Sequence, residues 1–145
     1  MKERFETFTV LIAKISRNIR KIKNREMAEY GLRGAQVSCL YYLYCEGALI
    51  ASELCERCEE DKATISRAIE HLEQKGYIVS EETEGRRYKS PLSLTEKGKE
   101  VGKRISDKVE GVLSEVSADL TEKERNSFYR SLNAISEGLE RYGNR

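Results

Sequence analysis

DKATISRAIEHLEQKGY, residues 61–77, is the stretch that decides the fold. Its apolar residues recur at i, i+3, i+4 and i+7, the spacing of one helix face: Ile65, Ala68, Ile69 and Leu72. Asp61 stands before this stripe, where a short acceptor side chain can cap the first turn. Gly76 stands after it, where glycine can end a helix in the left-handed conformation. The stretch therefore predicts a helix of about four turns, bounded at both ends.

The opposite edge of this helix begins with hydroxyls and cations in its first two turns: Lys62, Thr64, Ser66 and Arg67. Isolated cations are usually solvated surface charges, but these share one face with the hydroxyls. A helix that presents such groups at its N-terminus can enter a DNA major groove. The pattern favours a DNA-reading helix, although Thr64 and Ser66 are also compatible with local hydrogen bonds near the helix start.

The composition is that of a single helical domain. The chain has 145 residues, of which 35% are charged and one is proline. Its 26 basic and 25 acidic residues nearly cancel, which argues against a generic polyanion binder but allows a local basic surface. The N-terminal MKERFETF is too charged for a secretory signal, and no apolar run reaches the ~18 residues of a membrane span. We expect a soluble cytoplasmic protein with reduced thiols.

Two segments at the chain ends carry narrow apolar stripes. The first, a predicted helix from about residue 3 to 28, has a heptad-like stripe: Phe5, Phe8, Ile12, Ile15, Ile19 and Ile22. The last, which begins at a capping box of Thr121 and Glu124, repeats the pattern: Phe128, Leu132, Ile135, Leu139 and Tyr142. Such stripes without a core of their own need a partner, so the two helices are predicted to pack together across a two-fold axis in a dimer.

Between these ends the sequence predicts a buried helix, a helix-turn-helix and a hairpin. Residues 35–45 form an apolar helical segment that Gly47 ends, and a short helix within residues 49–58 precedes Asp61. Residues 77–94 suggest a two-stranded hairpin with a basic tip. Thr95 can cap a helix from residue 96, with a predicted inner face of Val101, Ile105, Val109, Val112 and Val116. The predicted fold class is mainly α with a small β-hairpin wing.

This order of elements resembles the MarR family of winged-helix transcription regulators over nearly the whole chain. Four segments carry the resemblance: ASEL (51–54), DKATISR (61–67), LEQKGYI (72–78) and LSLTEKG (92–98). The resemblance implies one MarR-like domain over residues 1–145. Its dimerisation helices would occupy about residues 1–30 and 96–145, and its winged helix-turn-helix DNA-binding region about residues 34–94.

The resemblance also implies a function. Family members of this kind are homodimeric transcription regulators that bind a palindromic operator in double-stranded DNA, and many are repressors released by a small ligand or by cysteine oxidation. The implied base-reading residues are Lys62, Ala63, Thr64, Ser66 and Arg67. Arg86 or Arg87 at the wing would reach the minor groove, whose narrow, negative interior favours arginine.

The chain departs from the family pattern at two places. The family often has glycine followed by a hydrophobic residue before the recognition helix, where this chain has Glu59 and Glu60. These carboxylates should weaken nonspecific attraction to phosphate. The wing has Glu84 where the family often has an aspartate that orients the tip arginine, which leaves open whether Arg86 or Arg87 enters the groove.

The four cysteines invite a metal or redox interpretation. They are Cys39, Cys45, Cys55 and Cys58. A zinc site needs four good ligands, but there is no second Cys-x-x-Cys and the only histidine, His71, has no partner at ligand spacing. Carboxylates near Cys55 and Cys58 should raise their pKa, against thiol sensing. We expect no metal, no cofactor and four cysteines that pack in the core, with a thiol-sensing regulator as an alternative.

Tyrosines gather where the family's ligand pocket lies: Tyr30, Tyr41, Tyr42 and Tyr44. Tyr30, Tyr41 and Tyr44 are candidates to line a pocket for a small aromatic ligand, and an aromatic core with hydroxyls at its rim is equally compatible. The sequence shows no nucleophile–base constellation and no phosphate-cradling glycine loop, so no enzyme is predicted. The remaining alternative is a winged-helix adaptor that binds protein through its acidic turn.

Overall fold

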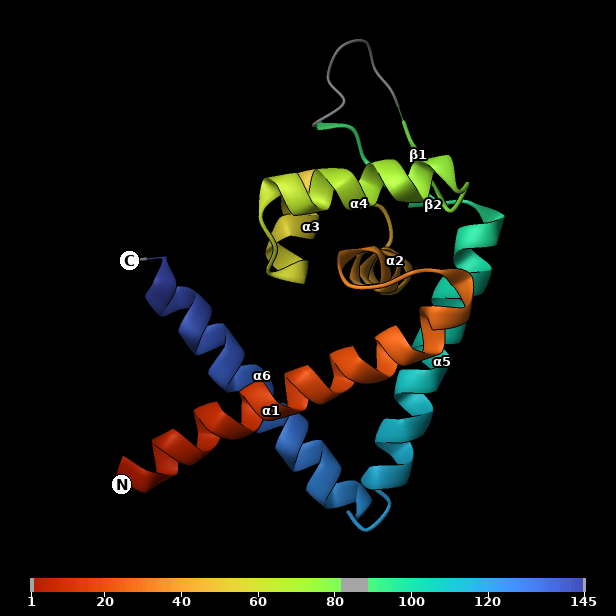
Figure 1. Cartoon of the computed structure of the whole chain (residues 1–145). Helices are drawn as coiled ribbons and strands as arrows, with labels where there is room; N and C mark the ends of the chain where they lie inside the picture. The colour runs from red at the N-terminus through yellow and green to blue at the C-terminus, as the bar shows by residue number, and fades with distance from the viewer. Residues whose placement is uncertain (1, 82–88, 145) are drawn as a thin grey trace. The chain divides into compact units, whose positions relative to one another are not determined.

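The computed structural model describes residues 2–81 and 89–144, with side chains from residue 7 onward. The elements in chain order are α1 (Lys2–Met27), the 3-10 helix η1 (Ala28–Tyr30), α2 (Ala35–Glu46), α3 (Ala51–Cys58), α4 (Lys62–Gln74), β1 (Ile78–Ser80), β2 (Leu92–Leu94), α5 (Glu96–Val116) and α6 (Glu122–Gly143) (Figure 1). This order confirms the predicted fold class, a mainly helical winged helix-turn-helix. None of the described helices is both long and apolar enough to span a membrane.

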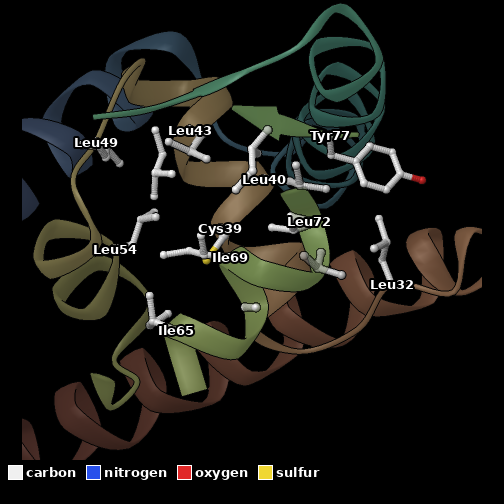
Figure 2. Packing of buried hydrophobic residues seen from close by; sticks show 14 of the residues in the cluster. Leu32, Cys39, Leu40, Leu43, Leu49, Leu54, Ile65, Ile69, Leu72 and Tyr77 are labelled. Carbon is white, nitrogen blue, oxygen red and sulfur yellow. The ribbon is translucent and has the colours of Figure 1, made fainter. Parts of the chain in front are cut away.

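The chain forms two compact units, residues 1–110 and 111–145, and the boundary falls within α5. In the first unit α2 is central, because it packs against α1, α3, α4 and β2. Figure 2 shows Cys39 and Leu40 of α2 among side chains of the helix-turn-helix. Leu40, Leu54 of α3 and Leu72 of α4 have no exposed surface. The hydrophobic core therefore fixes α3 and α4 on α2.

The helix α4 has the predicted boundaries. The Asp61 carboxylate accepts a hydrogen bond of 2.7 Å from the backbone N–H of Thr64, and Gly76 takes a positive φ of 79° just beyond the helix. The predicted apolar stripe is buried in full: Ile65, Ala68, Ile69 and Leu72. Local sequence signals were sufficient here because cap, stripe and terminator all agree.

The predicted hairpin is present as two short antiparallel strands. β1 pairs with β2 in the register Ile78 with Leu94, Val79 with Ser93 and Ser80 with Leu92. An isolated bridge between Leu49 and Leu92 joins the segment before α3 to the same strand pair. The tip of the wing, with Arg86 and Arg87, lies outside the described residues.

The start of α5 packs very closely on the rest of the first unit. A Cβ atom at Gly98 would collide with the Tyr77 carbonyl oxygen, and one at Gly102 would lie 2.9 Å from the Tyr44 Cβ. Gly102 weakens the helix by propensity alone, yet its missing side chain lets two helices approach. On the predicted inner face Val101, Ile105 and Val109 are buried, Val112 is half-buried and Val116 is exposed.

The described residues of the apolar stripes of α1 and α6 are exposed or partly exposed in the single chain. On α1, Ile12 and Ile15 are 40% and 47% exposed. On α6, where the Thr121–Glu124 capping box is present, no residue is buried, and Leu139 is 63% exposed. Exposed apolar surface of this extent indicates an interaction site. Dimerisation through these helices agrees with it and stays a prediction.

Candidate nucleic-acid interface

The predicted reading residues lie together on the first two turns of α4. Lys62, Ala63, Ser66 and Arg67 are exposed and Thr64 is half-buried. The Arg67 guanidinium lies 3.4 Å from the Thr64 hydroxyl, to which it donates a long hydrogen bond. One turn of the helix thus presents a cation and a hydroxyl side by side. Such groups can donate hydrogen bonds to base edges and phosphates.

A recess beside this edge adds a cation that the sequence did not single out. It is lined by Asn24, Arg33, Gly34, Ala35, Gln36, Thr64, Arg67 and Ala68. Arg33 is exposed, so guanidinium groups from two segments border one recess, an arrangement suited to a phosphate oxygen. Arg33 lies in the break between helices, where no periodicity marks it. Only the fold brings it beside Arg67.

The acidic turn between α3 and α4 has a conformational explanation. Glu59 has φ 54° and is the only described residue other than glycine with a positive φ. It terminates α3, where its backbone N–H donates to the Glu56 carbonyl at 3.4 Å. Because L-residues with a side chain enter this region at a cost, a glycine suits the position better. Glu59 therefore departs from the family pattern at a place where backbone geometry favours glycine.

The acidic residues of this turn are exposed. The backbone N–H of Thr64 donates to Asp61 and so lowers the pKa of its carboxyl from the usual value. Glu59 and Glu60 are exposed, and their side chains have no such capping role.

The Leu-Thr-Glu-Lys-Gly segment, residues 94–98, connects the end of α4 to the start of α5 through hydrogen bonds. The Thr95 hydroxyl donates to the Gly76 carbonyl at 2.6 Å and accepts from the Gly98 N–H at 3.1 Å. The Lys97 ammonium donates to the Lys75 carbonyl at 2.7 Å and lies 4.5 Å from the centre of the Tyr77 ring. These contacts hold the C-terminus of the recognition helix, and they account for the motif.

The thiols differ from the expectation that all four pack in the core. Cys39 is fully buried, Cys55 and Cys58 are half-buried, and Cys45 is exposed. The prediction for Cys45 was wrong because six residues along a helix make about one and two-thirds turns, which brings it to another face of α2 than Cys39. The Sγ atoms of Cys39 and Cys58 lie 4.0 Å apart.

The expected rise in the Cys58 pKa was also wrong. The thiols of Cys39 and Cys58 share a hydrogen bond in which either sulfur can donate; this contact lowers the pKa of the Cys58 thiol, and the Lys23 ammonium also lowers it. Burial raises the pKa of Cys55, as predicted in direction. Cys39 and Lys23 are both far from Cys58 in sequence, and together they outweigh burial and the nearby Glu60 carboxylate, which raise the Cys58 pKa.

The candidate ligand-pocket tyrosines do not line one pocket. Tyr30 borders a recess with Arg104, and its hydroxyl accepts a 2.7 Å hydrogen bond from that residue. Tyr41 borders a second recess and Tyr44 a third. Desolvation raises the pKa of Tyr41 to about 12, consistent with the core interpretation for that residue. Tyr42 also packs against the core.

The described residues do not form a cluster of metal ligands, and the single histidine is part of α4. Across residues 2–81 and 89–144, no group of three or more His, Cys, Asp or Glu side chains could hold a metal ion. His71 is half-buried, within the range expected for a structural residue of the helix.

The comparisons with known proteins agree with this architecture. A sequence profile of the MarR family matches residues 30–87. The crystal structure of MarR is 30% identical, covers 92% of this chain and 98% of its own, and superposes with a TM-score of 0.73. A MarR family protein from Listeria monocytogenes complexed with a 26mer DNA is 27% identical over 88% of this chain and 85% of its own, with a TM-score of 0.75. The uncharacterized HTH-type transcriptional regulator YybA of Bacillus subtilis is 28% identical over 90% of this chain and 87% of its own.

Proposed function

The chain belongs to the MarR family of winged-helix transcription regulators, and on that premise we propose that it is a homodimeric, sequence-specific repressor. Its relatives are named as transcription regulators rather than enzymes. The proposed binding partner is therefore double-stranded DNA. The observation that carries the proposal is the exposed cluster of cations and hydroxyls on the first two turns of α4.

The proposed contacts divide into base reading and phosphate positioning. The first two turns of α4 enter the major groove with the base-reading set of Lys62, Ala63, Thr64, Ser66 and Arg67. Arg33 binds a backbone phosphate at the recess that it shares with Arg67. Arg86 or Arg87 of the wing enters the adjacent minor groove. Support comes from the DNA complex of the Listeria monocytogenes relative, which was solved with a 26mer.

The dimer rests on the apolar stripes of α1 and α6. Their exposed isoleucine and leucine side chains would be covered by a second copy of the chain, which removes apolar surface from water. A two-fold dimer fixes the distance between two recognition helices, and a palindromic operator with matching half-site spacing follows from that symmetry. As in the sequence analysis, we assign about residues 1–30 and 96–145 of the single domain to dimerisation and about residues 34–94 to DNA binding.

Release by a small aromatic ligand is the proposed regulation. The recess of Tyr30 and Arg104 has a volume of about 690 Å³, within the usual range of about 300–1,000 Å³ for small-molecule sites. Lys97 and Tyr77 also line it, and both take part in the contacts at the end of α4. A ligand carboxylate that binds Lys97 would compete with the Lys75 carbonyl and shift the recognition helix toward a state of lower operator affinity.

The test is selection of bound duplexes from a random pool, followed by binding of the selected operator to Arg67→Ala. Loss of a base-reading arginine should weaken binding by roughly 1–3 kcal/mol and relax specificity at one position. Arg130→Ala, an exposed arginine of α6, is the matched charge control and should bind as wild type.

Two outcomes would contradict the proposal. Operator affinity of Arg67→Ala equal to that of wild type would show that α4 does not read the bases. Absence of any duplex affinity at about 50 mM salt, where phosphate contacts are strongest, would favour the protein-binding adaptor instead.

A further inference from the structure

Cys39 of α2 and Cys58 of α3 place two thiol sulfurs 4.0 Å apart, and the buried Lys23 of α1 lines the same recess as Cys58. We propose that these two thiols, as thiolates, bind one soft monovalent metal ion such as Cu(I), with Lys23 as the counter-charge of the complex. From the sequence we considered a metal site at the Cys-x-x-Cys pair, Cys55 and Cys58, and expected none. The proposal concerns the metal site alone and does not depend on DNA binding.

The distance between the two sulfur atoms fits a shared ion. A metal–thiolate bond of about 2.3 Å holds two sulfurs about 3.8 to 4.6 Å apart as the S–metal–S angle widens from tetrahedral to linear. The observed Sγ–Sγ distance of 4.0 Å lies in this interval, so α2 and α3 can keep their positions when the ion binds. A disulfide needs about 2.05 Å, and its formation would require the two sulfurs to approach by about half of their present separation.

The number of ligands selects the class of ion. Structural zinc takes four ligands, whereas the described part of the chain offers no group of three or more His, Cys, Asp or Glu side chains. Thiolates are soft ligands that favour Cu(I), and closed-shell monovalent ions of this kind are satisfied by two of them. A pair of thiols without further ligands therefore suits Cu(I) and excludes a tetrahedral zinc centre.

Lys23 explains the preference for a monovalent ion. It is only 6% exposed, its ammonium lies 4.5 Å and 5.5 Å from the ring centres of Tyr41 and Tyr42, and it lines the same recess as Cys58. None of the ion pairs among the described residues includes Lys23.

The charge of the complex follows from its parts. Two thiolates and a monovalent ion carry a net charge of −1, which the Lys23 ammonium neutralises. A divalent ion would give a neutral complex and leave the buried ammonium without an anion, which is costly in a site of low dielectric. Binding releases two protons to solvent, because two thiols and one monovalent cation give one dithiolate complex of charge −1 and two protons.

Cys58 gives the ion a route to the pair. It is half-buried and lines a recess that is open to solvent between α1, α2 and α3, whereas Cys39 is fully buried behind it. Ser16, Arg20 and Ser38 also line this recess. An incoming ion meets the Cys58 sulfur first and then Cys39, so neither helix has to separate from the core.

The experiment is an anaerobic titration of the full chain with Cu(I), in the presence of a non-thiol reductant and a chromophoric Cu(I) chelator as competitor. We expect one ion per chain that resists the chelator, and X-ray absorption that shows two sulfur neighbours. Cys58→Ser should abolish this binding. Cys55→Ser, on the same helix, and Cys45→Ser, at an exposed position, should leave it unchanged. Lys23→Met should lower the Cu(I) affinity by roughly 10–100-fold, as is typical for loss of an outer partner of a metal site.

Three results would overturn the proposal. Tight Cu(I) binding that survives Cys58→Ser would show that Cys39 and Cys58 are not the two ligands. A loss of Cu(I) affinity in Cys55→Ser equal to that in Cys58→Ser would indicate a site with three thiolates. The X-ray absorption of the wild-type protein needs no variant, and a first shell other than two sulfurs would end the proposal even if a variant failed to fold.

Discussion

The Thr95 hydroxyl donates a hydrogen bond of 2.6 Å to the backbone carbonyl of Gly76, 19 residues earlier in the chain. Gly76 takes a positive φ just after α4, and Thr95 is the residue before α5. The same hydroxyl accepts from the Gly98 N–H, so one side chain caps the start of α5 and satisfies a carbonyl at the end of α4. The orientation of the recognition helix is thereby coupled to the helix that leads out of the winged domain.

Thr95→Val should destabilise the protein by about 1–2 kcal/mol, because it removes a helix cap and leaves the Gly76 carbonyl without its partner. Thr95→Ser keeps the hydroxyl, so its loss of stability should be less than about half of the loss in Thr95→Val. Urea denaturation followed by circular dichroism measures both. A larger loss in Thr95→Ser than in Thr95→Val would show that the methyl group, not the hydrogen bond, stabilises this junction.

Two glycines of α5 give a matched pair of substitutions. Gly98→Ala would place a Cβ against the Tyr77 carbonyl oxygen, and overpacking of this kind typically costs about 1–3 kcal/mol. Gly111 has open space around its Cα, so Gly111→Ala should stabilise the protein by about 0.5–1 kcal/mol through helix propensity. Thermal unfolding of both variants measures the difference. Stabilisation in both would mean that Gly98 is not a close-packing position.

Features that depend on neighbours in the chain were predictable from the sequence. The limits of α4 and the Thr121–Glu124 capping box follow from residues within a few positions of each other, and the strands of the wing follow from short β-prone runs on either side of a turn. Caps, terminators and apolar periodicity are local codes, and in these segments they agree.

Features that depend on residues distant in the chain were not predictable. Arg33 borders the same recess as Arg67, and Lys23 of α1 sets the environment of Cys58, although no local pattern joins either pair. The three candidate pocket tyrosines line separate recesses, because Tyr30 lies in η1 whereas Tyr41 and Tyr44 lie on α2, where their side chains diverge around the helix axis.

Glu59→Gly should stabilise the protein by about 1 kcal/mol, because glycine enters the left-handed region without the side-chain penalty of about 1–2 kcal/mol but loses more backbone entropy on folding. The change also removes a carboxylate beside the reading edge, so nonspecific duplex affinity at low salt should rise. Urea denaturation and fluorescence anisotropy measure the two effects.

Glu60→Gly is the control for Glu59→Gly. Glu60 has no positive φ, so glycine there should destabilise the protein by up to about 1 kcal/mol through the unfolded-chain entropy. It removes the same charge and should raise nonspecific duplex affinity to a similar extent. A loss of stability in both variants would contradict the explanation that Glu59 occupies a glycine position.

The Asp61 cap makes the stability of α4 depend on pH in a definite direction. The Thr64 N–H lowers the pKa of the Asp61 carboxyl in the folded state, so the cap's contribution is present above the unfolded pKa of about 3.9 and is lost as pH falls through the lower folded value. Asp61→Ala should therefore be less stable than wild type by a constant amount above about pH 5. The difference between the two proteins should shrink below about pH 4.

Asp61→Asn separates charge from hydrogen bonding, because asparagine caps helices without titrating. Its stability relative to Asp61→Ala should stay the same from about pH 7 to pH 2, whereas that of wild type declines over the acid end of this range. Urea midpoints at closely spaced pH values measure both differences. If wild type kept its full advantage over Asp61→Ala at the lowest pH, the ionised carboxylate would not be the group that accepts the Thr64 N–H.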